Sequence, residues 1–333
     1  MPFNDTAHRC YLAPQPLVSS ILPPMLIIEL LLGLPGNLMA LWVFSRHLRS
    51  WKPNVVLLFN LAVADLMLLV SLPYQIHYHL QQENWVFGHF WCRFNLFMLA
   101  INRSASIGFM TAVAVDRYFK VVHVHHKINF ISSRTVAGIA CFIWIVVILL
   151  RLPLLTSDLM IIKNNKSVCR SFNYYKNPPP GILFHYIVYL SEFFLSFIVL
   201  LFCSLRIYCF LGRRQIATRT KMRPAMKIVL VIIGIFIVCF FPGVATGLSA
   251  LYLSTLGKEY YDGLRLNGQL FVLALGLTYL NSALDPIVYG FCSSMFRDAL
   301  RQSIHRLGSV KGSKKYFLQP LKGRGNAKIR TVK

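Results

Sequence analysis

Seven long apolar stretches run through this chain, and they decide what it can fold into. They cover about residues 18–44, 54–80, 91–122, 134–155, 182–211, 225–253 and 266–290. Each is near the roughly 20 residues that a helix needs to cross the hydrocarbon core of a bilayer. Helix is the conformation that fits, because backbone polar groups in lipid must be satisfied within their own segment. The sequence therefore predicts an all-α membrane protein, a seven-transmembrane helix bundle.

The basic residues lie between and after these stretches. The chain has 35 Lys and Arg against 11 Asp and Glu, a formal net charge of +24. Such a balance often indicates nucleic-acid binding. The mean hydropathy of +0.56 favours a membrane setting instead, so we expect no nucleic-acid partner. Cations gather on the cytoplasmic side of membrane proteins. This places the loops near 46–52, 120–134 and 212–223, and everything after 290, inside the cell.

The same pattern divides the chain into four parts in a multi-pass protein of the plasma membrane. Residues 1–17 form an extracellular N-terminus, and residues 18–290 form the membrane domain. Apolar residues recur at helical spacing over 291–307, with arginines between them, and predict an amphipathic eighth helix against membrane lipids. The basic tail 308–333 is predicted to be disordered. We expect no cleaved signal peptide.

Two glycosylation triplets agree with this orientation. The triplets at Asn4 and Asn165 lie on the predicted outer side, where they can be glycosylated. Of eight cysteines, five lie in or at the end of apolar runs and are expected to pack there. Cys10, Cys92 and Cys169 remain. The cysteine spacing is not that of a metal site.

Charged residues at bilayer depth are costly, so each is a functional hypothesis. They are Glu29, Asp65, Arg103, Asp116, Arg117, Arg151, Glu192 and Asp285. An intramembrane enzyme would need a nucleophile with a base or a metal cluster, and the isolated His185 does not supply one. A transporter would need broken helices or repeated halves, and a channel a filter loop or a ring of charges. The sequence shows none of these.

Ordered motifs on the seven stretches carry a resemblance. They are Gly36-Asn37, Leu61-Ala62-Val63-Ala64-Asp65, Asp116-Arg117-Tyr118, Trp144, Cys239-Phe240-Phe241-Pro242, Asn281, and Asp285-Pro286-Ile287-Val288-Tyr289. Together they resemble the rhodopsin-like (class A) G-protein-coupled receptors over nearly the whole chain. The resemblance implies a receptor, with no enzymatic activity, that signals to a heterotrimeric G protein. Plain helix packing is the alternative for Asn37 and Pro286, and the favoured reading for Trp144.

The resemblance implies a switch for the G protein at Asp116, Arg117, Tyr118 and Tyr289. Arg117 is always charged, so its release from a latch makes a two-state element. A toggle is implied at Phe240 and Pro242, because proline removes a backbone hydrogen bond and kinks the helix.

A disulfide between Cys92 and Cys169 is also implied, as is a sodium site. The sodium residues are Asp65, Ser106, Asn281 and Asp285. Two carboxylates in one dry pocket favour a cation or a proton, so sodium is expected as an allosteric modulator, with no other metal or cofactor. Four positions depart from the family pattern and put details of the switch in doubt: Ser196, Ser204, Phe240 and Asp285.

Arg103 is the strongest candidate for the ligand site. It lies 11 residues beyond Cys92, about 16 Å deeper in a helix and on the same face. A guanidinium at the floor of a cavity matches a carboxylate. The alternative is an internal pair with Glu192 or Asp65. One turn outward stands Leu99, where amine-binding receptors carry an aspartate, which argues against a monoamine ligand.

Shorter segments narrow the resemblance to the hydroxycarboxylic-acid receptors; they include Phe97 to Arg103, Asp116 to His123, Glu192 to Leu195 and Leu277 to Ser282. The run from Arg103 to Phe109 is more similar to the related oxo-eicosanoid and hydroxy-eicosanoid receptors. The resemblance implies a small carboxylate or lipid-acid ligand and coupling to the inhibitory G protein, Gi.

By this resemblance the ligand carboxylate meets Arg103, with Ser171 and Tyr279 as hydrogen-bond partners and Phe271 as an apolar wall. Tyr279 could equally hydrogen-bond within the bundle. Gly247 stands where several relatives carry a second arginine, and Cys10 has no evident partner. These departures slightly favour a longer fatty acid over a short hydroxy acid. A peptide or nucleotide ligand remains the alternative within the receptor class.

Overall fold

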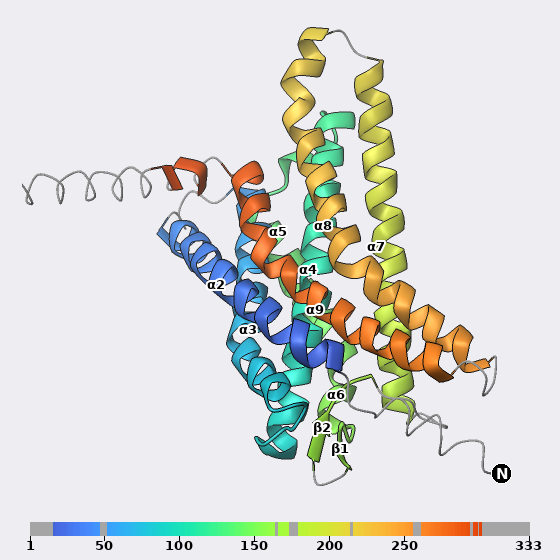
Figure 1. Ribbon diagram of the computed structural model, residues 1–333. Helices are drawn as coiled ribbons and strands as arrows, with labels where there is room; N and C mark the ends of the chain where they lie inside the picture. Colours follow the sequence, from blue (N-terminus) through green and yellow to red (C-terminus); the bar gives the residue numbers. More distant parts are fainter. Residues whose placement is uncertain are drawn as a thin grey trace, which may run out of the picture.

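Seven long helices form a single bundle in the computed structural model (Figure 1). The structure describes residues 16–46, 52–163, 166–172, 179–213, 216–255, 261–293, 296–298 and 300–301. The seven helices are α2 (Pro16–Arg46), α3 (Pro53–Leu80), α4 (Gly88–Val122), α5 (Ser133–Arg151), α7 (Pro180–Gly212), α8 (Ile216–Thr255) and α9 (Tyr261–Cys292). Within the described ranges, these seven are long and apolar enough to cross a membrane.

The observed helices confirm the seven predicted stretches and lengthen most of them. The largest difference is in α8, which begins at Ile216. The predicted loop over 212–223 is therefore wrong for most of its length, because Gly212 still belongs to α7 and residues 216–223 belong to α8. Charged residues do not prevent a helix from continuing past the apolar core, because Lys, Arg and Met are good helix formers.

The helix α4 occupies the centre of the bundle and contacts α3, α5, α7 and α8. In the apolar stretch of α4, 72% of the residues are buried inside the protein, whereas the corresponding share is only 22% in the spans that contain α5 and α7. The exposed side chains of those two helices are large and apolar, such as Phe142, Ile198 and Leu205. Lipid suits such a surface, because in a bilayer apolar side chains need not be hidden from water. The helix α9 packs against both α2 and α8.

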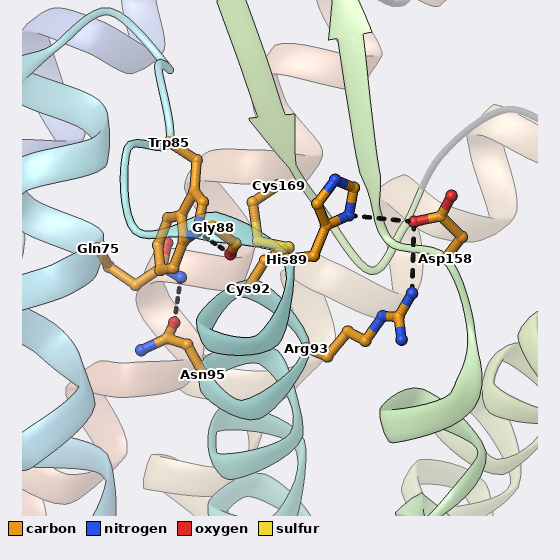
Figure 2. The surroundings of a disulfide bond; sticks show 9 residues. All are labelled: Gln75, Trp85, Gly88, His89, Cys92, Arg93, Asn95, Asp158 and Cys169. Atoms are coloured by element: carbon orange, nitrogen blue, oxygen red, sulfur yellow. Dashed lines mark hydrogen bonds and ion pairs between the residues drawn. A yellow bond between two sulfur atoms is a disulfide. The ribbon is translucent and has the colours of Figure 1, made fainter.

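A hairpin of β1 (Met160–Lys163) and β2 (Lys166–Cys169) lies at one end of the bundle (Figure 1). We call this the disulfide end, after the bond described next. Figure 2 shows Cys92, at the start of α4, bonded to Cys169 at the end of β2, which confirms the predicted disulfide. The buried Trp85 is held beside this bond: its Nε1 donates to the Gly88 carbonyl at 3.0 Å, and its backbone N–H donates to Ser167. The bridge therefore fixes the segment that leads from β2 into the bundle.

Two short elements complete the described chain. A 3-10 helix, η2 (Lys127–Phe130), follows α4. The single turn α6 (Pro153–Thr156) follows α5 at the disulfide end and contacts α4 and α7.

Buried polar side chains tie neighbouring helices together. Asn37 donates to the carbonyls of Gly33 and Ser282, which links α2 to α9. Trp144 donates to Asn60 Oδ1 at 2.9 Å, which links α5 to α3. Both residues thus have packing roles in the bundle, as expected for Trp144.

Some predicted features lie wholly or partly outside the described residues. Asn4, Cys10, Asn165 and the tail 308–333 are outside them. Of the predicted helix over 291–307, residues 296–298 and 300–301 are helical beyond the end of α9. Phe296 is buried there against Phe44 and Tyr289.

Gly36 tests the close approach of α2 to α9. A Cβ at this position would meet the Pro286 ring at 2.5 Å, and that ring is rigid. We expect Gly36→Ala to destabilise the purified protein by about 1–3 kcal/mol, the usual cost of overpacking, as measured by thermal unfolding in detergent. Gly138→Ala in α5 is the matched control, because its Cβ meets nothing within 4 Å. Equal unfolding temperatures for the two variants would contradict the observed α2–α9 contact.

Candidate ligand-binding site

Two small neighbouring cavities lie within the bundle toward its disulfide end. The disulfide-side compartment has a volume of about 60 Å³ and is lined by residues that include Gln75, Tyr78, His79, Arg170 and Phe271. The arginine compartment has a volume of about 40 Å³ and is lined by residues that include Leu99, Arg103, Arg151, His185 and Tyr189. Both are lined by Leu96, Ser171, Phe172, Leu275 and Tyr279, so they form one cleft in two parts.

All five residues predicted for the ligand site line this cleft. Leu99 and Arg103 line the arginine compartment, and Phe271 lines the disulfide-side compartment. Ser171 and Tyr279 line both. Within the described part of the chain, the Tyr279 hydroxyl makes no hydrogen bond to a neighbouring helix. The sequence reasoning therefore selected residues that lie together, although they come from three separate segments.

Arg103 is buried and already has a carboxylate partner. Its Nη1 lies 3.1 Å from Glu192 Oε2, and its Nη2 donates to the backbone carbonyl of Tyr189 at 3.2 Å. The guanidinium also lies over the Tyr189 ring, 3.8 Å from its centroid, and 5.7 Å from the ring of Phe240. The internal pair with Glu192, one of the two readings of Arg103, is thus present in the structure.

A second arginine that the sequence reasoning left without a role shares the same carboxylate. Arg151, at the end of α5, is only 1% exposed. Its Nη2 lies 2.5 Å from Glu192 Oε2, and its Nε donates to Ser104 Oγ at 2.9 Å. Its Nη1 lies 2.9 Å from His185 Nδ1. Arginine has no acceptor atom, so Nδ1 must accept and the proton of neutral His185 is on Nε2.

The arginine compartment offers donors that lack acceptors. Arg103 Nε, His185 Nε2 and the Tyr189 hydroxyl are all buried without a hydrogen-bond partner. Buried polar groups are normally satisfied, and unsatisfied ones need an explanation. An ionised carboxylate is an acceptor-only group and matches such a set. The cleft can therefore bind an anion.

Phe172 forms a wall that the sequence reasoning missed. Its ring centroid lies 4.8 Å from that of His185, 4.9 Å from that of Tyr189 and 5.1 Å from that of Phe271. It follows the predicted site residue Ser171 directly, which is the one signal that could have pointed to it. The disulfide at Cys169 places both residues over the cleft.

The four residues predicted to hold sodium contain three unsatisfied oxygens. These are Ser106 Oγ, Asn281 Oδ1 and Asp285 Oδ1, all buried without a hydrogen-bond partner. Asp285 also accepts from Asn281 Nδ2 at 3.0 Å. Oxygen atoms of these kinds suit a hard cation, so the donor set fits sodium.

The side chain of Asp65, the fourth residue predicted to hold sodium, is hydrogen-bonded to its neighbours. It accepts from Ser282 Oγ at 2.7 Å, and the Tyr289 hydroxyl lies 2.8 Å from its other oxygen. The same hydroxyl lies 3.0 Å from Asn37 Oδ1. Tyr289 thus points into the bundle and joins the predicted sodium residues to α2.

The predicted G-protein switch forms a local charge cluster at the end of α4. Asp116 Oδ2 lies 3.1 Å from Arg117 Nη2, and Asp116 Oδ1 lies 2.7 Å from Lys120 Nζ. The sequence has no Asp or Glu between Glu192 and Glu259, so the nearby end of α8 cannot supply a second acid for Arg117. Tyr118 packs instead against His123, with its hydroxyl 3.0 Å from His123 Nε2.

Comparison with known proteins decides what these features belong to. The family model described as 7 transmembrane receptor (rhodopsin family) matches residues 36–289. The chain belongs to this receptor family. It is 42% identical over 280 residues to the human hydroxycarboxylic acid receptor 1, covering 84% of this chain and 79% of the relative. Human hydroxycarboxylic acid receptor 3 is 40% identical over 299 residues, covering 90% and 76%. Human oxoeicosanoid receptor 1 is 36% identical over 309 residues, covering 93% and 78%.

In this receptor the predicted toggle lies next to Arg103, one of the residues that line the cleft. Phe240 is 1% exposed, packs against Phe236 with 5.3 Å between ring centroids, and faces the guanidinium of Arg103. Pro242 lies two residues further along α8, where it removes one backbone hydrogen bond of the helix. Phe240 is therefore the side chain that lies between Arg103 and the point where α8 can bend.

Gly243 tests how Tyr189 is held beside Arg103. A Cβ at Gly243 would fall on the Tyr189 hydroxyl oxygen, whereas the next ring atom, Cζ, is 3.8 Å away. We expect Gly243→Ala to destabilise the receptor by about 1–3 kcal/mol, and Tyr189→Phe in the same chain to remove most of that cost. Thermal unfolding of the single and double variants measures both. Gly234→Ala, on the same helix in open space, is the control. If the stability effects of Gly243→Ala and Tyr189→Phe simply add, the contact between Gly243 and the Tyr189 hydroxyl is absent.

Proposed function

We propose that this receptor binds a small carboxylic acid in the two-part cleft and signals through Gi. One observation carries the proposal: Arg103, His185 and Tyr189 line the arginine compartment, and each has a buried donor without a hydrogen-bond partner. The charge balance supports it as well, because two buried arginines share a single carboxylate. An incoming carboxylate would satisfy the donors and supply the missing negative charge.

The ligand's carboxylate meets the free Nε edge of Arg103, with Ser171 and Tyr279 within the same cleft as hydrogen-bond partners. Phe172 and Phe271 cover the apolar part of the acid on the side of the disulfide. Position 99, where amine-binding receptors carry an aspartate, is a leucine, so this wall of the arginine compartment has no acidic side chain. The site therefore rejects a cationic amine, because an ammonium ion would face two arginines.

The dimensions of the cleft favour a short acid. Pockets that bind drug-sized ligands have volumes of roughly 300–1,000 Å³, whereas the compartments have volumes of about 60 and 40 Å³. A twenty-carbon fatty acid would need several side chains to move. The sequence comparison points the same way, with 42% identity to a hydroxycarboxylic acid receptor against 36% to the oxoeicosanoid receptor. We therefore place the ligand among the short hydroxycarboxylic acids, in contrast to the slight sequence preference for a longer one.

Binding is read out by α8 and by the charge cluster of Asp116 and Arg117. A ligand that draws Arg103 away from Glu192 also moves the cation that lies over Tyr189 and Phe240. Phe240 then repacks next to Pro242, and the far end of α8 swings outward. Arg117 leaves Asp116 and meets the G protein, at a face that the basic residues of the loops place in the cytoplasm of the cell.

Sodium binds among Asp65, Ser106, Asn281 and Asp285 in the inactive receptor. The three unsatisfied oxygens described above support this assignment. The residues around Asp65 also hold Tyr289 in its inward position. Sodium would thereby stabilise the conformation in which the switch is closed.

The main test is Gi activation in cells that express the receptor, with acids from lactate through 3-hydroxybutyrate to oxidised twenty-carbon fatty acids. We expect a short hydroxy acid to activate. Its methyl ester should be inactive, and Arg103→Ala should weaken the response at least about a hundredfold, because a hydrogen bond between two charged groups is lost. The variant should still fold, since Glu192 keeps Arg151 as its partner.

The matched control for this test is Arg93→Ala. Arg93 is a cation at the disulfide end that pairs with the exposed Asp158 outside the cleft (Figure 2). It should leave the response within about threefold of wild type, as expected for a surface pair. A normal response of the Arg103 variant or of the methyl ester would reject the carboxylate mechanism. The ligand would then be sought among peptides or nucleotides.

The sodium assignment is tested by thermal unfolding in sodium chloride against choline chloride at equal ionic strength. We expect sodium to stabilise the receptor by about 1 kcal/mol through binding to the folded state. Asp285→Asn should remove this difference between the two salts. Asp262→Asn, an exposed position on the same helix, should retain it. A sodium effect that survives Asp285→Asn would place the ion elsewhere.

A further inference from the structure

The two arginines and one glutamate at the cleft form an incomplete set of charges. Arg103 and Arg151 both donate to one atom, Glu192 Oε2, at 3.1 and 2.5 Å. Their side chains are 5% and 1% exposed, and that of Glu192 is 15% exposed. His185 adds no charge, because its Nδ1 accepts from Arg151. The cluster therefore holds two positive charges and one negative charge in a site that water hardly reaches.

No other described side chain lining the cleft removes this excess. The remaining cation on its wall, Arg170, pairs with Glu83 at the disulfide end. The other lining residues are neutral or apolar. A buried, uncompensated charge is costly, so the cluster is completed by one further negative charge from outside the protein.

The two arginines differ in whether they have a hydrogen-bond donor without a partner. Every nitrogen of Arg151 is engaged, with Ser104, His185 and Glu192. Arg103 keeps its Nε without a partner. An incoming anion therefore hydrogen-bonds to Arg103, while Arg151 acts on it through charge and through its hold on Glu192.

We propose that Arg151 is a specificity-determining residue that sets, together with Glu192, the charge of the acid this receptor accepts. Glu192 takes the place of a second ligand carboxylate, so the site binds monocarboxylates and rejects dicarboxylates. Arg151 supplies the positive charge that Glu192 would otherwise cancel at Arg103. This inference rests on the proposed function and names the ligand class more narrowly.

The test compares matched acids by thermal stabilisation of the purified receptor. The pairs are lactate with tartronate and 3-hydroxybutyrate with malate, in which a carboxylate replaces a methyl group. Wild type should bind each monocarboxylate at least about tenfold more tightly than its dicarboxylate partner, since an unpaired buried charge is strongly disfavoured.

Variants of the cluster then separate charge from structure. Arg151→Gln leaves Arg103 balanced by Glu192, so monocarboxylate binding should weaken at least about tenfold. Adding Glu192→Gln restores the excess of one positive charge, so the double variant should recover binding to within about threefold of wild type. A residue with only a structural role would not be rescued by removal of its partner.

Glu192→Gln alone should reverse the preference, because both arginines then lack a carboxylate and a dicarboxylate supplies two. If that variant does not fold, the rescue of Arg151→Gln by the double change still decides the matter. Arg93→Gln, which removes one cation outside the cleft, should bind the acids as wild type does.

Two kinds of failure are distinct. If monocarboxylates stabilise wild type but Arg151→Gln binds them equally well, or the double variant is as weak as Arg151→Gln, the inference is wrong and the proposed function stands. If no acid of either pair stabilises wild type, the short-acid function is wrong and the inference falls with it.

Discussion

The shared carboxylate of Glu192 is the interaction on which the ligand end of this receptor depends. Two guanidinium groups at membrane depth repel each other strongly in a low-dielectric setting, and Glu192 lies between them. It thereby joins α4, α5 and α7 at one atom. It also decides the state of Arg103, which would otherwise be a bare cation facing the cleft. Under the proposed function, ligand binding and folding thus depend on the same charge in this region.

The ligand cleft and the switch are connected by adjacent side chains. Arg103 contacts the rings of Tyr189 and Phe240, and Tyr189 rests against the backbone of α8 at Gly243. Phe240 lies two residues before Pro242, where α8 has lost a backbone hydrogen bond. Under the proposed function, repacking of Phe240 is the step that carries ligand binding to α8, a helix of 40 residues.

The departures from the family pattern have physical consequences that the structure makes visible. Gly247 stands where the resemblance implies a second arginine in several relatives, and Phe271 lies beside it. The second cation comes instead from Arg151 on a different helix. Asp285, where asparagine is commoner, places a second carboxyl group near Asp65 and leaves one of its oxygens unsatisfied.

The sequence by itself determined the class and the spans. Seven apolar stretches of sufficient length leave helix as the conformation that satisfies the backbone in lipid, and the observed helices follow them closely. It also identified Arg103, Leu99, Ser171, Phe271 and Tyr279, which come together at one cleft. The spacing from Cys92 to Arg103 was enough to predict how deep Arg103 lies and which helix face it is on, because the number of residues in a helix sets both distance and angle.

Only the tertiary structure decided the partners of the buried charges. Arg151 and Glu192 are 41 residues apart, and no periodicity within one helix can say which neighbour will face it. The choice of Glu192 over Asp65 as the partner of Arg103 depends on how α4, α5 and α7 pack together. His185 looked isolated in the sequence for the same reason. Contacts between helices are set by packing across the bundle, which a pattern along one chain does not encode.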